Sequence, residues 1–556
     1  MDANGRKHYL TRWEGLKTER SSWDGHWKEL AQYVLPRSSR FLTTDRNRGD
    51  KKHNRIYDNT ATRALRTLSA GLMAGMTSPA RPWFRIATVD RDRMQSQAVK
   101  EWCYDVTTLM LRIFAVSNTY RALHTIYDEL GLFGTGCDIV MPNFNNVIHH
   151  HPNTAGEYAI FTDDFGIPCG MYREFDYTVA QLVKKFGKEN CSRAVQNLFD
   201  RGGKGLDAWV TVLHAIEPRD QRDYSRIDNK NMPFASCYIE IGADSDRILS
   251  ESGFRYFNAL CPRWTTTGTD IYGTSAAMDA LGDIKQLQQQ QLSKSEAIAY
   301  KVKPPLQAPV AFKELAHNLF PGGMSFVDSA TAQQGIRTAF EVNLDLSHLL
   351  EDIHDVRGRI DRAFYADLFL MLANDPVGQK TATEIAERHE EKMLMIGPVL
   401  ERLHNELLDP LIDITFAECA EAGILPQIPP ELEGQDLKVE FVSVLAQAQR
   451  AIGANGLDRY IGTVSAVASV KPDILDKLNV DELADYYADI LGVEPRLIIP
   501  TDQAAIVRQQ RAQQAAMANA AEMAPKVSSA AVDMSQIQQQ NPGATGNMLR
   551  ALTGYT

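Results

Sequence analysis

This chain of 556 residues lacks several features that mark common classes of protein. Its seven cysteines form no CxxC pair and are odd in number, which argues against a disulfide framework or a zinc site and favours reduced thiols in a cytosolic compartment. No window approaches 18 uncharged apolar residues, so no transmembrane helix is predicted. The polar first ten residues lack the apolar core of a signal peptide.

An excess of basic residues is also missing. Lys and Arg number 59 against 70 Asp and Glu, a formal net charge of −11. Proteins that grip nucleic acid carry a basic surface, and this chain taken whole does not. A protein that lets DNA slide past it would benefit from not gripping it, yet most acidic proteins never meet DNA. The charge therefore permits a DNA channel without predicting one.

Sequence motifs of catalysis are absent as well. There is no GxxxxGK[ST] phosphate loop and no GxSxG, and His389 to Lys392 lacks the second histidine of HExxH. The glycines of 131–136 follow a predicted helix, so they indicate a turn. Residues 149–151 are three histidines, interpreted as a solvent-exposed loop, and residues 163–166 are interpreted as a hairpin turn. We therefore predict no catalytic residue, no cofactor and no metal.

Apolar periodicity predicts the secondary structure of the first half. A helix carries Trp13, Trp23 and Trp27 on one face and stops at Pro36, and these tryptophans are core or subunit-interface anchors. The basic stretch 37–66 is either a solvated loop or a contact with DNA or an acidic subunit face. The other predicted elements are helices over 59–77, 97–116 and 120–133, a strand over 81–86, and a mixed β region over 137–265 with one helix near 178–186.

A long helical hairpin dominates the middle of the chain. Helices are predicted over 275–301 and 345–373, and each would be roughly 40 Å long. Between them lies an insert, 302–340, that is rich in proline and glycine. A hairpin of this length does not bury both faces alone, and a ring of identical hairpins would supply the neighbours that it needs.

The second long helix carries an apolar seam at heptad spacing. The predicted stem-packing residues are Leu346, Leu349, Ile353, Val356 and Ile360. In the first helix a similar stripe gives way to four glutamines, 288–291. One seam with polar flanks suits a helix pair in a barrel of such pairs with a polar lumen. A two-helix coiled coil inside a monomer is equally compatible with the composition.

Helices are also predicted beyond the hairpin. Thr381 and Glu384 fit a capping box that starts a helix toward residue 423. Gly397-Pro398 and Asp409-Pro410 are expected to kink it. Shorter helices follow over 440–500, and an Ala- and Gln-rich tail begins near residue 503.

An ordered set of short segments resembles the head-to-tail connector (portal) proteins of short-tailed bacteriophages. The similarity covers about residues 9–430. The segments around the hairpin are Pro262-Arg263-Trp264, Tyr272-Gly273, Met278-Asp279-Ala280-Leu281, Asp283-Ile284-Lys285 and Lys303-Pro304-Pro305-Leu306. The others are Trp13-Glu14 with Arg20, residues 72–79, Arg81-Pro82-Trp83-Phe84 and residues 381–384.

The resemblance implies an α+β, mainly α-helical portal fold, assembled as a ring of usually twelve subunits at one capsid vertex. The implied parts are a wing (1–270), stem helices (271–301 and 341–373), a clip (302–340), a tunnel loop (374–380), a kinked wing helix (381–435), a crown (436–510) and a partly disordered tail (511–556). The implied DNA-facing residues are Asn374, Asp375, Gly378, Gln379 and Lys380. The implied clip-docking residues are Pro304, Pro305, Pro321, Gly322 and Gly323.

The resemblance also implies partners. The ring would pass double-stranded DNA during packaging and ejection, and would bind the large terminase subunit, the major capsid and scaffolding proteins and tail adaptors. It would lie in the virion, after a stage in the host cytoplasm, without a membrane. Two other classes stay open. One is a coiled-coil scaffold or adaptor of the virion, and the other is a packaging nuclease or ATPase, which magnesium-dependent hydrolysis would reveal.

Overall fold

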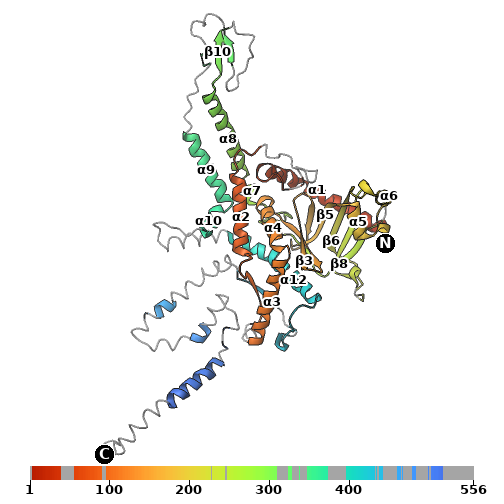
Figure 1. The fold of residues 1–556 in the computed structure, drawn as a ribbon, viewed down its shortest axis with the longest axis vertical. Helices are drawn as coiled ribbons and strands as arrows, with labels where there is room; N and C mark the ends of the chain where they lie inside the picture. Colours follow the sequence, from red (N-terminus) through yellow and green to blue (C-terminus); the bar gives the residue numbers. More distant parts are fainter. Residues whose placement is uncertain are drawn as a thin grey trace, which may run out of the picture. The chain divides into compact units, whose positions relative to one another are not determined.

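The computed structural model contains both helices and sheets, which confirms the predicted α+β class (Figure 1). The chain divides into two compact units. The first comprises Met1–Val89, Asp105–Ile428 and Gln435–Arg459, and the second comprises Asp90–Tyr104, Pro429–Gly434 and Tyr460–Thr556. The structure describes residues 3–38, 40, 55–90, 96–223, 225–226, 228–243, 247–309, 324–327, 337–338, 347–373, 396–432, 434, 437–442, 460–464, 466, 479–483, 497, 499 and 503–517.

The largest sheet of the first unit is an antiparallel meander of five strands in sequence order. Its strands are β4 (Tyr158–Thr162), β5 (Pro168–Thr178), β6 (Trp209–Pro218), β7 (Phe234–Glu240) and β8 (Ser250–Phe254). The predicted hairpin turn at 163–166 joins β4 to β5, where Gly166 has a φ of 76° and donates to the Asp163 carbonyl. The predicted β region is therefore confirmed.

Helix α1 (Ala3–Tyr33) packs its tryptophan face against one side of this sheet. Trp13 stacks on Tyr172 of β5 with ring centroids 6.5 Å apart, and Trp27 meets Tyr272 edge-on at 5.1 Å. Both tryptophans are fully buried within the chain. Their prediction as core anchors is confirmed, because a large flat ring fills the space between a helix and a pleated surface.

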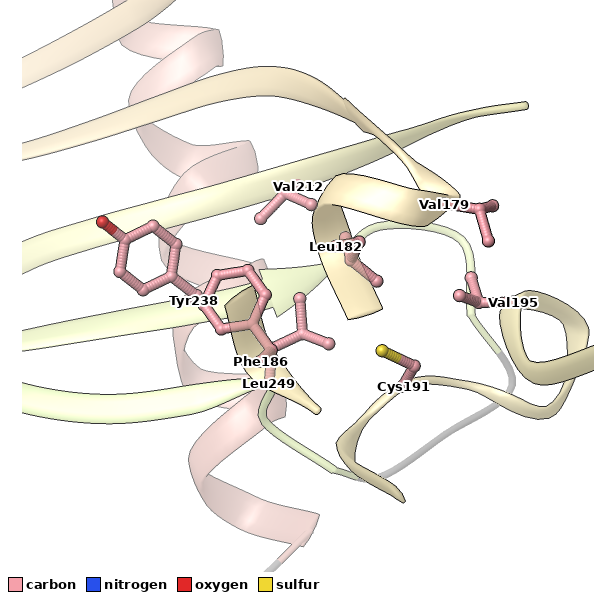
Figure 2. Close-up of a cluster of buried hydrophobic side chains, with 8 residues drawn as sticks. All are labelled: Val179, Leu182, Phe186, Cys191, Val195, Val212, Tyr238 and Leu249. Carbon is pink, nitrogen blue, oxygen red and sulfur yellow. The ribbon is translucent and has the colours of Figure 1, made fainter. Parts of the chain in front are cut away.

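Two short helices cover the opposite face of the sheet (Figure 2). Helix α5 (Val179–Phe186) was predicted, and its capping box pairs Thr178 with Gln181. Helix α6 (Arg193–Arg201) was not predicted, because its nine residues are too few to show a helical period clearly. Four short 3-10 turns accompany the sheet and the second unit: η2 (Lys188–Asn190), η3 (Gly203–Gly205), η4 (Asn229–Asn231) and η8 (Pro430–Leu432).

A three-stranded sheet, in the order β3-β2-β9, contains the three histidines. The strands are β2 (Cys137–Asn143), β3 (Val147–Asn153) and β9 (Ala259–Leu260). The prediction of an exposed loop at 149–151 is therefore wrong. Alternation along β3 turns His150 into the core, where it is 1% exposed. Its neighbours in sequence point to the other side, and their rings lie 4.9 Å apart.

The predicted helices of the first half are confirmed within one or two residues. They are α2 (Thr60–Met76), α3 (Gln97–Val116) and α4 (Thr119–Phe133). Helix α4 ends at Gly134, which has a φ of 76° and lies against Gly273, so close that a Cβ on either glycine would overlap the other's carbonyl. The glycine run is thus a turn, as predicted. Strand β1 (Phe84–Thr88) pairs antiparallel with β13 (Leu437–Phe441).

The helix after residue 396 changes its hydrogen bonding before Asp409-Pro410. A π-helical turn, η7 (His404–Leu408), leads directly into α12 (Asp409–Glu421). Such a turn accommodates the amide that Pro410 does not supply. It also places Glu406 against the buried Arg263, with N–O distances down to 2.7 Å. The predicted capping box at 381–384 lies outside the described residues.

In the second unit, residues 503–517 form a helix whose side chains are almost all exposed. Arg508 of this helix forms two hydrogen bonds to Asp481, at 2.5 and 2.6 Å. Their mutual attraction raises the pKa of Arg508 and lowers that of Asp481. The described start agrees with the helical beginning predicted for the tail.

Candidate functional site: the helical hairpin and its base

The central hairpin is built from two antiparallel helices, α8 (Leu281–Val302) and α9 (Ser347–Ala363) (Figure 1). Asp283 near the start of α8 pairs with Arg359 near the end of α9 at 3.1 Å. One turn further on, Gln286 donates to Asp352 of α9 at 3.4 Å. Because the contacts advance along α8 while they go back along α9, the two helices form the predicted hairpin. Polar contacts join them along one side.

Short elements flank the two long helices. Helix α7 (Ala276–Asp279) begins at a Ser275 cap and is separated from α8 by Ala280. Strands β10 (Leu306–Pro309), β11 (Met324–Val327) and β12 (Arg337–Thr338) form a small sheet within the insert, in the order β11-β10-β12. Pro304 and Pro305 lie between α8 and β10, whereas Pro321, Gly322 and Gly323 lie outside the described residues.

The apolar seam of α9 is closed within a single chain. Ile353, Val356 and Ile360 are each at most 1% exposed, and Leu349 is half-buried. Leu346 lies outside the described residues. On α8 the buried apolar residues are Leu281, Ile284 and Leu287. Three side chains of the predicted seam are thus covered within one chain, while the choice between a ring of hairpins and a coiled coil inside a monomer stays a prediction.

The surface that the hairpin leaves to solvent is mostly polar. On α8 the exposed residues include the uncharged Gln286, Gln289 and Ser293, the charged Glu296 and Lys301, and the apolar Ile298 and Val302. On α9 the exposed residues are largely charged, among them Glu351 and Asp355. A neighbour that contacts this described part of the hairpin therefore meets mainly hydrogen-bonding groups and charges, together with the exposed apolar side chains of Ile298, Val302 and Leu350.

Asp58 anchors the base of the hairpin to the segment before α2. Arg357 of α9 donates to its carboxylate at 2.6 Å, and Gln291 of α8 does so at 3.0 Å. Gln288, which is 4% exposed, accepts from the Asp58 amide and donates to its carbonyl. Burial alone would raise the pKa of Asp58, but hydrogen bonds from Thr60 and Arg357 outweigh burial and lower it.

A polar cavity of about 820 Å³ opens beside this anchor. Its charged lining combines Arg63 and Arg357 with Asp58 and Asp361, and His354 also faces it. Arg63 lies 3.6 Å from Asp361. Because the two signs balance, the lining does not select a ligand of either charge.

The second long helix is not continuous, which corrects the prediction for 345–373. Helix α9 ends at Ala363, and α10 (Ala366–Ala373) starts after a sharp break. Tyr365 has a φ of 54°, in the left-handed region, and its ring lies 6.2 Å from that of Trp264. A helix cannot continue through such a residue. The predicted tunnel-loop residues, which follow α10 at 374–380, lie outside the described residues.

Helix α10 packs on α2 at a glycine. A Cβ on Gly71 would lie 2.1 Å from a ring carbon of Phe369, so only glycine admits this ring. We expect Gly71→Ala to lower the free energy of unfolding by about 1–3 kcal/mol, as overpacking does. Gly358→Ala in α9 is the control, because nothing lies within 4 Å of its Cβ position. It should stabilise by about 0.5–1 kcal/mol through helix propensity. Equal effects in denaturant titrations would contradict this packing.

Three buried side chains, those of Asp138, His150 and Thr119, are linked in the order carboxylate, imidazole and hydroxyl, which is also found in hydrolase active sites. The Asp138 carboxylate lies 2.5 Å from Nδ1 of His150, and Nε2 of that ring lies 2.9 Å from the Thr119 hydroxyl. All three residues are at most 1% exposed, so no substrate reaches the hydroxyl. The trio instead ties β2, β3 and α4 together. Sequence reasoning missed it because its members are separated by a strand and a helix.

No group of three or more His, Cys, Asp or Glu side chains in the described ranges is placed to hold a metal ion. Among the same residues, no helix combines the length and apolarity needed to cross a membrane.

Comparison with known proteins gives consistent matches along the chain. A family model described as "Bacteriophage head to tail connecting protein" matches residues 6–499. A "Probable portal protein" of Bordetella phage BPP-1 is 58% identical over 551 residues, covering 99% of each chain. A "Portal protein" of Salmonella phage epsilon15 is 41% identical over 530 residues, covering 95% of each. None of these descriptions names an enzymatic activity.

A solved structure, described as the virion of a native gene transfer agent particle, matches 72% of this chain and 94% of its own. The TM-score is 0.28 and the sequence identity 12%. That score is too low to establish a shared fold.

Proposed function

The chain belongs to the bacteriophage head to tail connecting protein family, and we propose that it acts as the portal of its phage, a closed ring that forms a DNA channel at one capsid vertex. The observation that carries this proposal is the full-length match to two proteins named as phage portals. As a member of this family the protein is a component of the virion. Packaging and ejection of double-stranded DNA would pass through the ring.

The polar exterior of the hairpin supports a channel role. Because Ile353 and Val356 are buried within the chain, they are not available to neighbouring copies. Subunits would therefore meet through the charged and amide-bearing faces of α8 and α9. The exposed charges of α8, Glu296 and Lys301, are of opposite sign, so this helix would give DNA phosphates neither strong net attraction nor strong net repulsion. The net charge of −11 per chain agrees with a channel that does not hold DNA tightly.

The parts of the portal are assigned as follows. The hairpin is the stem, residues 302–340 are the clip, residues 374–380 are the tunnel loop and residues 436–510 are the crown. The clip would dock the large terminase subunit and later the tail adaptors, while the wing would meet capsid and scaffolding proteins. A ring of twelve copies, assembled from chains made in the host cytoplasm, is the proposed state.

The tunnel-loop assignment predicts a packaging defect. Deleting residues 377–379 should leave ring assembly intact but reduce the packaged or retained DNA, because a shortened loop no longer reaches the DNA. A control variant, in which residues 377–379 are replaced by Gly-Ser-Gly, keeps the length of the loop but changes its side chains. It therefore distinguishes the effect of loop length from the effect of side-chain chemistry. Genome content per particle is the measurement. Full-length genomes packaged at the normal rate by the deletion variant would make this segment a plain connector.

A further inference from the structure

A row of polar side chains crosses the face of the main sheet beyond the apolar cluster of α5. Arg173 of β5 lies opposite His214 of β6, and His214 lies opposite Tyr238 of β7. The His214 and Tyr238 rings are stacked with centroids 4.0 Å apart. In Figure 2 the Tyr238 hydroxyl points out of the apolar cluster, away from Leu182 and Phe186.

Positive charge gathers around this row without a carboxylate to balance it. Arg173 is 7% exposed, and its contacts are the Asn153 side chain at 3.2 Å and the Phe175 ring at 4.6 Å. Lys185 of α5 donates to the Tyr177 hydroxyl at 2.9 Å and lies over the Tyr238 ring. In the described part of the chain, neither cation has an acidic partner within ion-pair distance. A buried guanidinium without a counter-ion is costly.

Three buried polar atoms of the row also lack a hydrogen-bond partner among the described residues. They are Nε of Arg173, Nδ1 of His214 and the hydroxyl oxygen of Tyr238. The three residues are 7%, 0% and 5% exposed. Each unsatisfied buried group costs about 1–3 kcal/mol, so three in adjacent register positions point to a missing partner.

His151, on the outer side of β3, responds to this positive charge. The pKa of His151 is lowered to about 4, because surrounding protein atoms remove part of its hydration and because Arg173 and His149 repel its proton. Burial, Arg173 and Lys185 likewise hold the pKa of His214 well below its usual range. The imidazoles stay neutral near pH 7, since their surroundings already carry positive charge.

We propose that this cluster, Arg173, His151, His214 and Lys185, is an oxyanion site that takes one phosphate or carboxylate group. An oxyanion would balance the two permanent cations and accept hydrogen bonds from Nε of Arg173 and from the Tyr238 hydroxyl. It would accept one from Nδ1 of His214 in the tautomer whose Nε2 accepts from the Ser236 hydroxyl, 2.9 Å away. The exposed side chains of Lys185 and His151 give the site its contact with solvent. Asp138 acts in the opposite direction and raises the pKa of His151. One of its carboxylate oxygens is hydrogen-bonded to His150, whereas the other, Oδ1, has no hydrogen-bond partner among the described residues.

Anion binding should be coupled to pH. A bound oxyanion favours protonated His151 and raises its pKa, so affinity should increase as pH falls from 8 toward 5. The titratable or charged groups linked to the site by contact or by electrostatic influence are Cys137 and Asp138 (β2), His149 and His151 (β3), Arg173 and Tyr177 (β5), His214 (β6), Tyr238 (β7) and Lys185 (α5).

The test is thermal unfolding of the full chain in inorganic phosphate and in acetate, each against chloride at equal ionic strength. Both oxyanions should raise the Tm by about 2 °C or more over chloride, with a larger rise at pH 5.5 than at pH 8. Lys185→Gln should abolish most of the rise. Lys184→Gln, at the exposed neighbouring position of α5, should retain it.

Calorimetric titration with phosphate should give one binding site per chain. The affinity should be lower for Lys185→Gln than for wild type and should be retained by Lys184→Gln. A Tm that does not exceed its value in chloride would mean that water alone satisfies the three orphan atoms, and would overturn the proposal. An equal rise in wild type and Lys185→Gln would indicate an adventitious ion only. A rise in phosphate without one in acetate would restrict the site to phosphate groups.

Discussion

Replacing Ile353 and Val356 together by aspartate is expected to prevent the hairpin from folding and the ring from forming. The two side chains are 1% and 0% exposed within one chain, so each aspartate would place a carboxylate in an apolar seam. The cost is several kcal/mol per residue, which is comparable with the whole stability of many domains. Circular dichroism melting and native mass spectrometry of the purified variant measure the two effects.

The control for this variant lies on the same helix. Leu350→Asp makes the same kind of change at a side chain that is 43% exposed, and it should leave the melting temperature nearly unchanged. If the double variant assembles with an unaltered Tm, the assignment of the buried face of α9 is wrong. If Leu350→Asp fails to assemble as the double variant does, the exposed surface that includes Leu350 is itself required for assembly.

Stability is expected to fall as pH rises through neutrality because of Glu129. This residue of α4 is 4% exposed and accepts hydrogen bonds from Thr154 and from the Ala155 amide. Burial raises its pKa from 4.5 to about 8 in spite of these hydrogen bonds. A carboxyl whose pKa is raised on folding stabilises the fold below about pH 4.5, and loses that contribution as pH rises toward 8. The full change is about 5 kcal/mol.

Glu129→Gln removes this titration. An amide can accept from Ala155 while donating to the Thr154 hydroxyl, so both partners stay satisfied. We expect the Tm of the variant minus that of wild type to increase between pH 5 and pH 9. Glu351→Gln, at a side chain 81% exposed, is the matched control and should show no such trend. A difference that is constant across this range would mean that Glu129 is ionised throughout.

Most of the helix predictions rested on the local periodicity of apolar residues. Helices α2, α3 and α4 appear within one or two residues of the predicted ranges, because regular apolar spacing or turn-forming residues mark their ends. The hairpin was found for the same reason. The break at Tyr365 was not, since a left-handed tyrosine has no sequence signal of its own and is imposed by the packing around it, including the contact with Trp264.

Contacts between distant segments could not be read from the sequence. The glutamines 288–291 suggested a polar lumen, yet Gln288 and Gln291 are buried and bind Asp58, more than 200 positions away. The three histidines were assigned to a loop, because nothing nearby in sequence indicates that Asp138 will face His150 across a strand pair. The assignments of residues 302–340, 374–380 and 436–510 stay predictions.

The central claim is that copies of this chain close into a ring, and native mass spectrometry of the purified protein together with electron microscopy tests it most directly. We predict a single closed assembly, of twelve copies, with a central hole of roughly 20 Å or more, the width of B-form DNA. Monomers or dimers under all assembly conditions, or an elongated open oligomer, would contradict the portal function and favour a coiled-coil scaffold or adaptor.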